Sequence, residues 1–194
     1  RQPGVITVVR RLVEEGDTQV WLEAGEIAGL ASADRTQLVP SRTLVVWTSP
    51  AADDVLEETL RRVNPRRMVW VGQGAGLFTT DEFLTRLAGL VKFALRTKNG
   101  SLSLEKLAAV TGQRVETVIA GLEYLLGGGW VSLAHASEEG WQVSAGGTPD
   151  KEIQTLSRAR VADLMAETGS YRQFLQHADL AKLVNMPAAA KKVR

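Results

Sequence analysis

Apolar residues follow two different periods in the first part of the chain. In "PGVITVVRRLVEEG" and "AADDVLEETLRRVNP" they fall on one helical face. Three other segments are rich in β-branched and aromatic residues, as strands are: 18–24, 42–50 and 66–73. Because helices and strands alternate, we expect a small Rossmann-like lobe over residues 1–76, with a parallel sheet and crossover helices. The segment 42–50 is the most apolar, so we expect it to be buried on both faces.

The middle of the chain predicts three helices and a hairpin. Thr79 and Thr80 are expected to cap a helix that extends to about Leu95. Its predicted core face consists of Leu84, Leu87, Val91, Ala94 and Leu95. Helices near 103–111 and 114–126 are joined by Thr111-Gly112-Gln113, and "WVSLAHASEEGWQVS" is typical of a β-hairpin. Three helices with a two-stranded wing predict a winged helix-turn-helix over residues 77–146.

The last part, 147–194, is expected to be a helical tail. "GGTPD" (146–150) separates it from the hairpin, and two helices are predicted, roughly 150–168 and 170–185, with a break at Gly169-Ser170. The predicted fold class is therefore α/β plus α+β. It combines a Rossmann-like sheet lobe, a winged helix-turn-helix and C-terminal helices.

The link "GQGAG" (72–76) has glycines at its first, third and fifth positions. A dinucleotide-binding turn needs them at the first, third and sixth positions of a loop that opens from a strand into a helix. We interpret the link as an interdomain linker, with a phosphate-binding loop as the alternative. No cofactor is expected.

Composition narrows the function classes. The 194 residues include 44% hydrophobic residues and no cysteine, and their formal net charge is +1. Without cysteine the chain has no disulfide or thiolate chemistry, which fits a cytoplasmic setting. No apolar run reaches the length of about 18 residues that indicates a membrane span, so no membrane partner is expected. The chain begins without Met, which suggests a piece of a longer protein.

Catalytic or metal-binding patterns are not recognisable. Paired acids such as Asp53-Asp54 and Glu57-Glu58 are neighbours on a helix, so their side chains diverge and favour a solvated face. The two histidines, His135 and His177, have no neighbour at metal-ligand spacing. We therefore expect neither a metal site nor catalysis by this chain.

Charge argues against a strong duplex-DNA reader. From Thr79 to Ala145 the chain has six basic and seven acidic residues, a net charge of 6 − 7 = −1. Phosphate contacts need Lys or Arg, so only weak nucleic-acid binding is expected. The candidate contacts are Lys92, Arg96, Lys98, Arg114 and, as an aromatic residue on the wing, Trp141.

Phe93 is a candidate for an interaction surface. It falls opposite the predicted core face of its helix, close to Arg86 and Arg96. A large apolar residue on a polar face indicates contact with a partner or with another lobe of the same chain. By contrast Trp21, Trp47, Trp70 and Trp130 lie in or beside predicted strands and are interpreted as packing residues.

Three segments together resemble a known family. They are "RTLVVWTSPAADDVLEETLRRVNPRRMVWVG", "FLTRLAGLVKFALRTKNGSLSLEKLAAVTGQRVETVIAGLEYLLGGGWV" and "ETGSYRQFLQHADLAKL". They cover about half of the chain and resemble the C-terminal region of bacterial RecJ proteins, single-strand-specific DNA exonucleases of the DHH phosphoesterase superfamily. The resemblance implies that the Asp-His-His cluster, which holds manganese or magnesium, and an OB-type domain lie upstream of Arg1 in a parent protein. No Asp-His-His occurs here, so no catalytic residue is transferred.

Two functions remain open from the sequence. The first is a non-catalytic accessory module of a RecJ-like exonuclease, which contacts a protein partner or other domains of the parent and guides single-stranded DNA weakly. The alternative is a winged-helix transcription regulator with a ligand-sensing α/β lobe.

Overall fold

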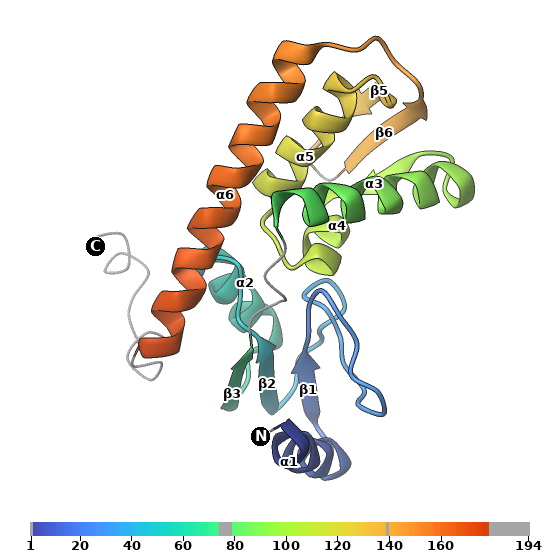
Figure 1. The fold of residues 1–194 in the computed structure, drawn as a ribbon. Helices are drawn as coiled ribbons and strands as arrows, with labels where there is room; N and C mark the ends of the chain where they lie inside the picture. Colours follow the sequence, from blue (N-terminus) through green and yellow to red (C-terminus); the bar gives the residue numbers. More distant parts are fainter. Residues whose placement is uncertain (1, 74–78, 139, 179–194) are drawn as a thin grey trace.

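The computed structural model describes residues 2–73, 79–138 and 140–178. Within them the chain is a mixed α/β structure with two three-stranded sheets, one parallel and one antiparallel, in two lobes (Figure 1). The elements are α1 (Gln2–Glu14), β1 (Thr18–Trp21), β2 (Thr43–Thr48), α2 (Asp53–Val63), β3 (Arg67–Gln73), α3 (Thr80–Thr97), β4 (Ser101–Ser103), α4 (Leu104–Thr111), α5 (Val115–Gly127), β5 (Val131–Ala136), β6 (Gly140–Ala145) and α6 (Lys151–His177). Most of the predicted link 72–76 lies outside the described residues.

Strand β2 is the centre of the first lobe. It pairs in parallel with β1 on one side and with β3 on the other, and all six of its residues are buried, as the apolar segment predicted. Val45 and Trp47 pack in one cluster with α1 residues, whereas Leu44 and Val46 pack in another with α2 residues. The parallel sheet is therefore covered by one helix on each face.

The prediction of crossover helices is correct for α2 and wrong for the first connection. Residues 22–42, between β1 and β2, form a loop. The loop is tied to the strand edge because Leu22 N donates to Ala33 O (3.0 Å) and Ala33 N donates to Val20 O (2.9 Å). The loop thus places residues 22–37 beside the carboxyl end of β1.

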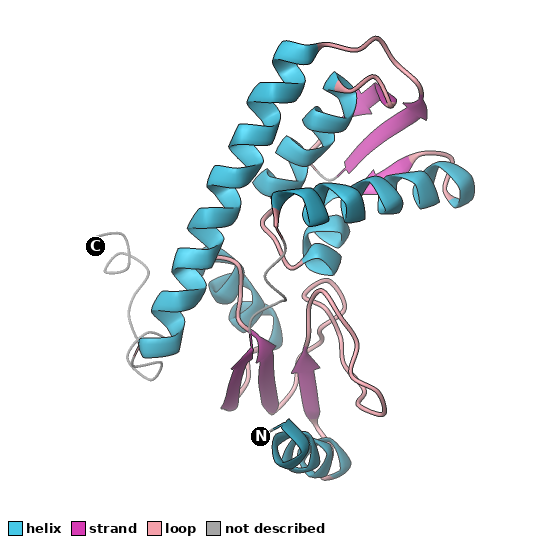
Figure 2. Ribbon diagram, in the orientation of Figure 1, coloured by secondary structure: helices cyan, strands magenta, loops and turns pink. Residues whose placement is uncertain are grey.

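The second lobe runs α3-β4-α4-α5-β5-β6. Its sheet is antiparallel with the order β4-β6-β5, and Figure 2 shows it at the far end of the molecule from the parallel sheet. The predicted hairpin is therefore part of a three-stranded sheet. Strand β4 was missed because three residues are too few to show a period, and it is defined by pairing such as Leu102 with Trp141.

Helix α3 begins where the sequence predicted. Thr79 Oγ1 accepts from Glu82 N (3.2 Å), and Glu82 Oε2 accepts from Thr79 N (2.7 Å), which is a complete capping box. The helix ends at Thr97. Its core face is the predicted one, except that Leu95 is half-buried and Phe83 is fully buried.

One continuous helix, α6, replaces the two predicted tail helices. It passes through Gly169 and Ser170 without a break, and Ser170 Oγ donates to Ala166 O at 3.0 Å. An interior glycine costs about 1 kcal/mol of helix stability. Buried Thr168 and Arg172 on either side offset this cost because they hold the helix against the rest of the molecule. The predicted continuation from residue 179 lies outside the described residues.

None of the helices in the described ranges combines the length and the apolar character that crossing a membrane requires.

The tryptophans divide between core and surface. Trp21 and Trp47 are buried and Trp70 is half-buried on the edge strand β3, so they pack as predicted. The prediction is wrong for Trp130, whose side chain is 53% exposed. Trp130 follows the turn after α5 and meets Tyr124 edge to face, with ring centroids 5.5 Å apart. That contact covers only part of the indole.

Two glycines near α3 give a matched test of the fold. Gly100 has φ +79°, and a Cβ there would lie 1.9 Å from Val143 O, whereas a Cβ at Gly89 would meet nothing within 4 Å. We expect Gly100→Ala to lower the free energy of unfolding by about 3 kcal/mol. Gly89→Ala is expected to raise it by about 1 kcal/mol. Urea unfolding followed by tryptophan fluorescence measures both, and equal stabilities would contradict the packing described at Gly100.

Candidate functional site

A buried polar junction lies where the two lobes meet, at the carboxyl end of the parallel strands. Its centre is Glu23, which follows β1 and is 2% exposed. Glu23 Oε1 accepts from Trp21 Nε1 at 2.9 Å and from Arg35 Nε at 2.5 Å, and Oε2 accepts from Arg35 Nη2 at 2.6 Å. The carboxylate is thus bound in a bidentate manner by one guanidinium.

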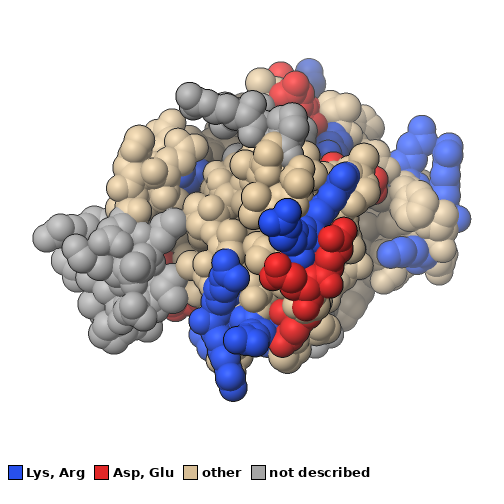
Figure 3. All heavy atoms as spheres, turned by 90° about the horizontal axis from the view of Figure 1, so that it is seen from below, with Lys and Arg blue, Asp and Glu red and all other residues tan. Residues whose placement is uncertain are grey.

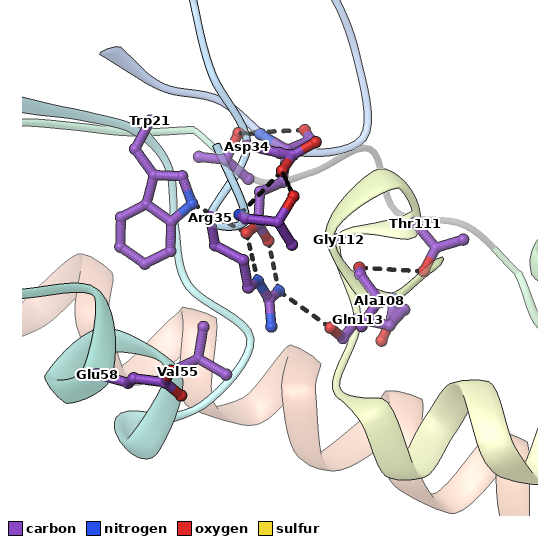
Figure 4. A network of polar contacts seen from close by, with 12 residues as sticks. Trp21, Asp34, Arg35, Val55, Glu58, Ala108, Thr111, Gly112 and Gln113 are labelled. Carbon is purple, nitrogen blue, oxygen red and sulfur yellow. Dashed lines mark hydrogen bonds and ion pairs between the residues drawn. The ribbon is translucent and has the colours of Figure 1, made fainter. Parts of the chain in front are cut away.

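Two arginines of the junction also hold the turn between α4 and α5. Arg35 Nη2 donates to Gln113 O at 3.0 Å (Figure 4), and Arg172 Nη2 donates to Gly112 O. Arg172 Nε donates to Ser49 O, at the end of β2, at 3.1 Å. The backbone of the helix–turn–helix is therefore bonded to both a loop of the α/β lobe and α6.

The junction contains two guanidinium groups and one carboxylate. Burial alone would lower the pKa of Arg35, but the hydrogen bonds and charge of Glu23 outweigh it and raise that pKa. Burial lowers the pKa of Arg172 to about 10, although the nearby Glu23 opposes this. Both groups remain charged at neutral pH. Backbone carbonyls of Ser49, Gly112 and Gln113 supply the remaining negative dipoles.

This junction occupies the usual ligand position of the fold class. Open parallel sheets bind ligands beyond the carboxyl ends of their strands. Here Glu23 and Ser49 follow β1 and β2, and the α4–α5 turn covers them. In the position where such sheets bind a ligand, the α/β lobe of this chain is bonded to the α4–α5 turn.

A cleft of about 450 Å³ lies beside the junction. The loop after β1 and the helices α3 and α4 line it, and its polar side chains are Glu26, Ser32, Asp34, Gln37 and Arg86. Ala24, also in its wall, has a left-handed φ of 58°, which is uncommon for a residue with a Cβ. Both signs of charge are present, so the cleft suits a small polar molecule better than an apolar one.

A second ion pair joins the lobes at Asp34. Asp34 Oδ2 accepts from Lys106 Nζ of α4, and Asp34 Oδ1 accepts from Thr36 N at 2.9 Å. Burial raises the pKa of Asp34, but the bonds from Lys106 and Thr36 outweigh this effect and lower it below its ordinary value. The charged form of Asp34 is therefore the one that the fold stabilises.

Helix α6 covers α5, the helix that follows the α4–α5 turn. Along α6, Arg160 pairs with Glu123 of α5 at 3.5 Å, and Glu167 pairs with Arg114 at 3.0 Å. Of the thirteen residues of α5, Glu116 is the single exposed one, and the others are buried or half-buried. Helix α5 is therefore largely enclosed.

An open basic surface lies at the carboxyl end of α3. We call it the α3 face and define it by Gly89, Lys92, Phe93, Arg96 and Lys98, which are all exposed. Figure 3 shows acidic and basic side chains side by side on the near side of the molecule. At its right-hand edge, towards which the carboxyl end of α3 extends in Figure 1, the charged side chains are basic.

The structure gathers four of the six predicted contact residues on the α3 face. Phe93 is 57% exposed, so it lies outside the core and is not covered by the other lobe. Arg114 is on a different helix and forms ion pairs with Glu116 and Glu167. Trp141 lies on β6, half-buried against the core of the second lobe.

Sequence reasoning missed the three charged residues of the junction. Glu23 ends the apolar stretch "VWLEA", which is the one local signal of a buried acid. Arg35 lies in an irregular loop, and Arg172 lies in the second of the two predicted tail helices. No residue near Arg35 or Arg172 in the sequence indicates that these two side chains are buried.

Comparisons with protein-family models, with curated proteins and with solved structures found no match. Within the described residues, no group of three or more His, Cys, Asp or Glu side chains is arranged to hold a metal ion.

Charge removal at Glu23 tests the junction. Glu23→Gln leaves Arg35 and Arg172 buried without their carboxylate, and we expect it to lower the free energy of unfolding by about 3 kcal/mol. Glu58→Gln is the matched control, since Glu58 forms an exposed pair with Arg62, and it should cost less than about 0.5 kcal/mol. Chemical unfolding monitored at the tryptophans, which include the Glu23 partner Trp21, compares the two. Similar losses would show that the junction does not hold the lobes together.

Asp34 gives a prediction on pH. Its pKa is lowered in the folded state, so the unfolded chain binds the proton more readily and the ionised form contributes stability. That contribution is present above the unfolded pKa of about 3.9 and is lost as pH falls through the folded pKa. We expect Asp34→Asn to be less stable than the wild type at pH 7 and equally stable at the acid end. A stability difference that is the same at both pH values would contradict this assignment.

Proposed function

We propose that residues 80–145 form a winged helix-turn-helix used as a binding scaffold, and that the chain is a non-catalytic accessory module of a cytoplasmic RecJ-like exonuclease. The element order α3-β4-α4-α5-β5-β6, with a three-stranded antiparallel sheet, supports the winged-helix assignment. The small parallel sheet with α1 and α2 on its two faces supports a Rossmann-like lobe. The resemblance of the three quoted segments supports the link to RecJ.

The observation that carries this proposal is the enclosure of α5. A helix that reads DNA needs exposed donors and acceptors along one face. Helix α5 packs on α6, and its single exposed side chain, Glu116, repels phosphate. A role in contacts with proteins or single strands fits this surface better than duplex reading does.

Several surfaces are available for such contacts. The α3 face offers cations and an aromatic ring for weak single-stranded DNA guidance. Helix α6 exposes Ile153 (46%), Leu156 (63%) and Phe174 (54%), which a protein partner or another domain of the parent would cover. Catalytic metal chemistry would belong to the upstream domains that the resemblance implies.

The transcription-regulator alternative has one observation in its favour. The polar cleft of about 450 Å³ beside the junction is a place where a small effector could bind. The same regulator would need α5 to reach a major groove. Ion pairs from Arg160 and Glu167 keep α6 over that helix, so this alternative requires α6 to move.

DNA binding separates the two functions. We expect the protein to bind a labelled duplex no more tightly than a single strand, with dissociation constants of tens of micromolar or weaker at physiological salt, as in non-specific binding. Glu116→Gln should leave both affinities unchanged because α5 makes no contact. Fluorescence anisotropy measures these affinities. Nanomolar, sequence-selective duplex binding would refute the accessory module and favour the regulator.

A further inference from the structure

The α3 face lies in a long stretch of chain without acidic residues. From Phe83 to Leu104 there is no Asp or Glu. The stretch contains four basic residues, Arg86, Lys92, Arg96 and Lys98. The acids of α3 lie in its first turn, where Glu82 serves the capping box and Asp81 pairs with Arg158. The carboxyl half of α3 is therefore basic without local neutralisation.

Three of these cations have no partner in the described part of the chain. Lys92, Arg96 and Lys98 form no ion pair or side-chain hydrogen bond there. Six other Lys and Arg side chains in the same ranges do form ion pairs: Arg35, Arg62, Lys106, Arg114, Arg158 and Arg160. The α3 face thus presents free charge, whereas the arginines of the lobe junction and of α6 are engaged in contacts within the chain.

Helix geometry places Lys92 and Arg96 next to the side chain of Phe93. Residues four apart lie on the same side of a helix, about 5–6 Å from each other, so Lys92 and Arg96 are neighbours and Phe93 lies beside them. Gly89, one turn before Phe93, would have nothing within 4 Å of a Cβ. Phe93 therefore has open space one turn towards the start of the helix, at Gly89, and has Lys92 and Arg96 as neighbours.

We propose that the α3 face binds single-stranded nucleic acid, with one base stacked on Phe93 and the flanking phosphates held by Lys92, Arg96 and Lys98. This inference rests on the proposed function and names the ligand of one of its surfaces. Stacking on an aromatic side chain beside a cationic track is how single strands are bound without sequence preference. A duplex hides its base faces and cannot use Phe93.

An acidic peptide is the competing ligand, and the shape of the α3 face argues against it. A peptide that anchors an apolar side chain needs a recess to bury it. Phe93 instead stands on the convex side of a helix, 57% exposed, next to a glycine. A base needs only an accessible ring face, which this surface supplies.

The test compares two labelled probes of the same length, an oligothymidylate of about 15 nucleotides and an abasic strand that keeps the phosphates and lacks the bases. Phe93→Ala is expected to weaken binding of the oligothymidylate about tenfold and to leave the abasic strand unaffected. Phe93→Trp should keep or improve the wild-type affinity. Phe174→Ala is the matched control, since Phe174 is a similarly exposed phenylalanine (54%) on α6, and it should change neither affinity.

The phosphate contacts are tested separately, by the salt dependence of binding. Lys92→Ala and Arg96→Ala should weaken both probes and reduce the slope of log affinity against log salt by about 0.7 each. Lys151→Ala, an exposed lysine at the start of α6, serves as the charge-matched control and should leave the slope unchanged. Anisotropy titrations at several salt concentrations give these values, and circular dichroism confirms that each variant is folded.

Each contrary outcome has a distinct meaning. Binding of the oligothymidylate that is insensitive to Phe93→Ala, or equal losses for both probes, would overturn the stacking inference and leave the accessory function standing. Binding of a Phe-containing acidic peptide at the α3 face, without binding of either strand, would overturn the inference in favour of a protein partner. Sequence-selective duplex binding would overturn the proposed function itself.

Discussion

The arrangement of this chain depends on the need to satisfy two buried guanidinium groups with one carboxylate. A charge removed from water is tolerated only where partners replace its hydration. Glu23 neutralises Arg35, and the remaining donors of Arg35 and Arg172 require backbone carbonyls. The backbone carbonyls of Gly112 and Gln113, in the α4–α5 turn, meet that need. The lobes are therefore held together by charged groups, each of which would destabilise the fold if it were buried without its partners.

The same constraint determines which surfaces stay open. Because Arg172 belongs to α6, the hydrogen bond that holds the turn also fixes α6 along the molecule, where it covers α5. Tyr171 Oη, which donates to Asp53 Oδ1 at 3.3 Å, adds a contact between α6 and α2. Helix α3 contacts α6 near its first turn, through Asp81 and Arg158. The carboxyl end of α3 is left exposed, so the open face of the second lobe is on α3 and not on α5.

The local sequence pattern is sufficient to predict much of the fold, but it does not predict the junction. The burial of β2, the N-cap at Thr79 and the position of Phe93 outside the core of its helix follow from residues close together in the sequence, and the sequence predicted them. The bonds of the junction link residues 60, 78 and 123 positions apart, and no local period records such a partner. The continuity of α6 through Gly169 is also a tertiary effect, because packing on both sides overrides a weak local preference. Trp130 shows the reverse case, in which a residue beside a strand remains exposed because it precedes the paired register.

For the surface of the second lobe, the positions of its ion pairs matter more than its net charge. Residues 79–145 have a net charge of −1, which treats paired and free groups alike. In the structure, Asp81 and Glu123 are paired with arginines of α6, and Glu116 lies beside Arg114. The acids are thus concentrated around α5 and α6, whereas the carboxyl half of α3 keeps its cations. Since salt screens exposed charges beyond about 8 to 10 Å, a phosphate approaching Lys92 and Arg96 meets the local charge and not the average. Under the proposed function, a nearly neutral lobe therefore attracts a single strand at the α3 face, whereas the enclosed helix α5 does not.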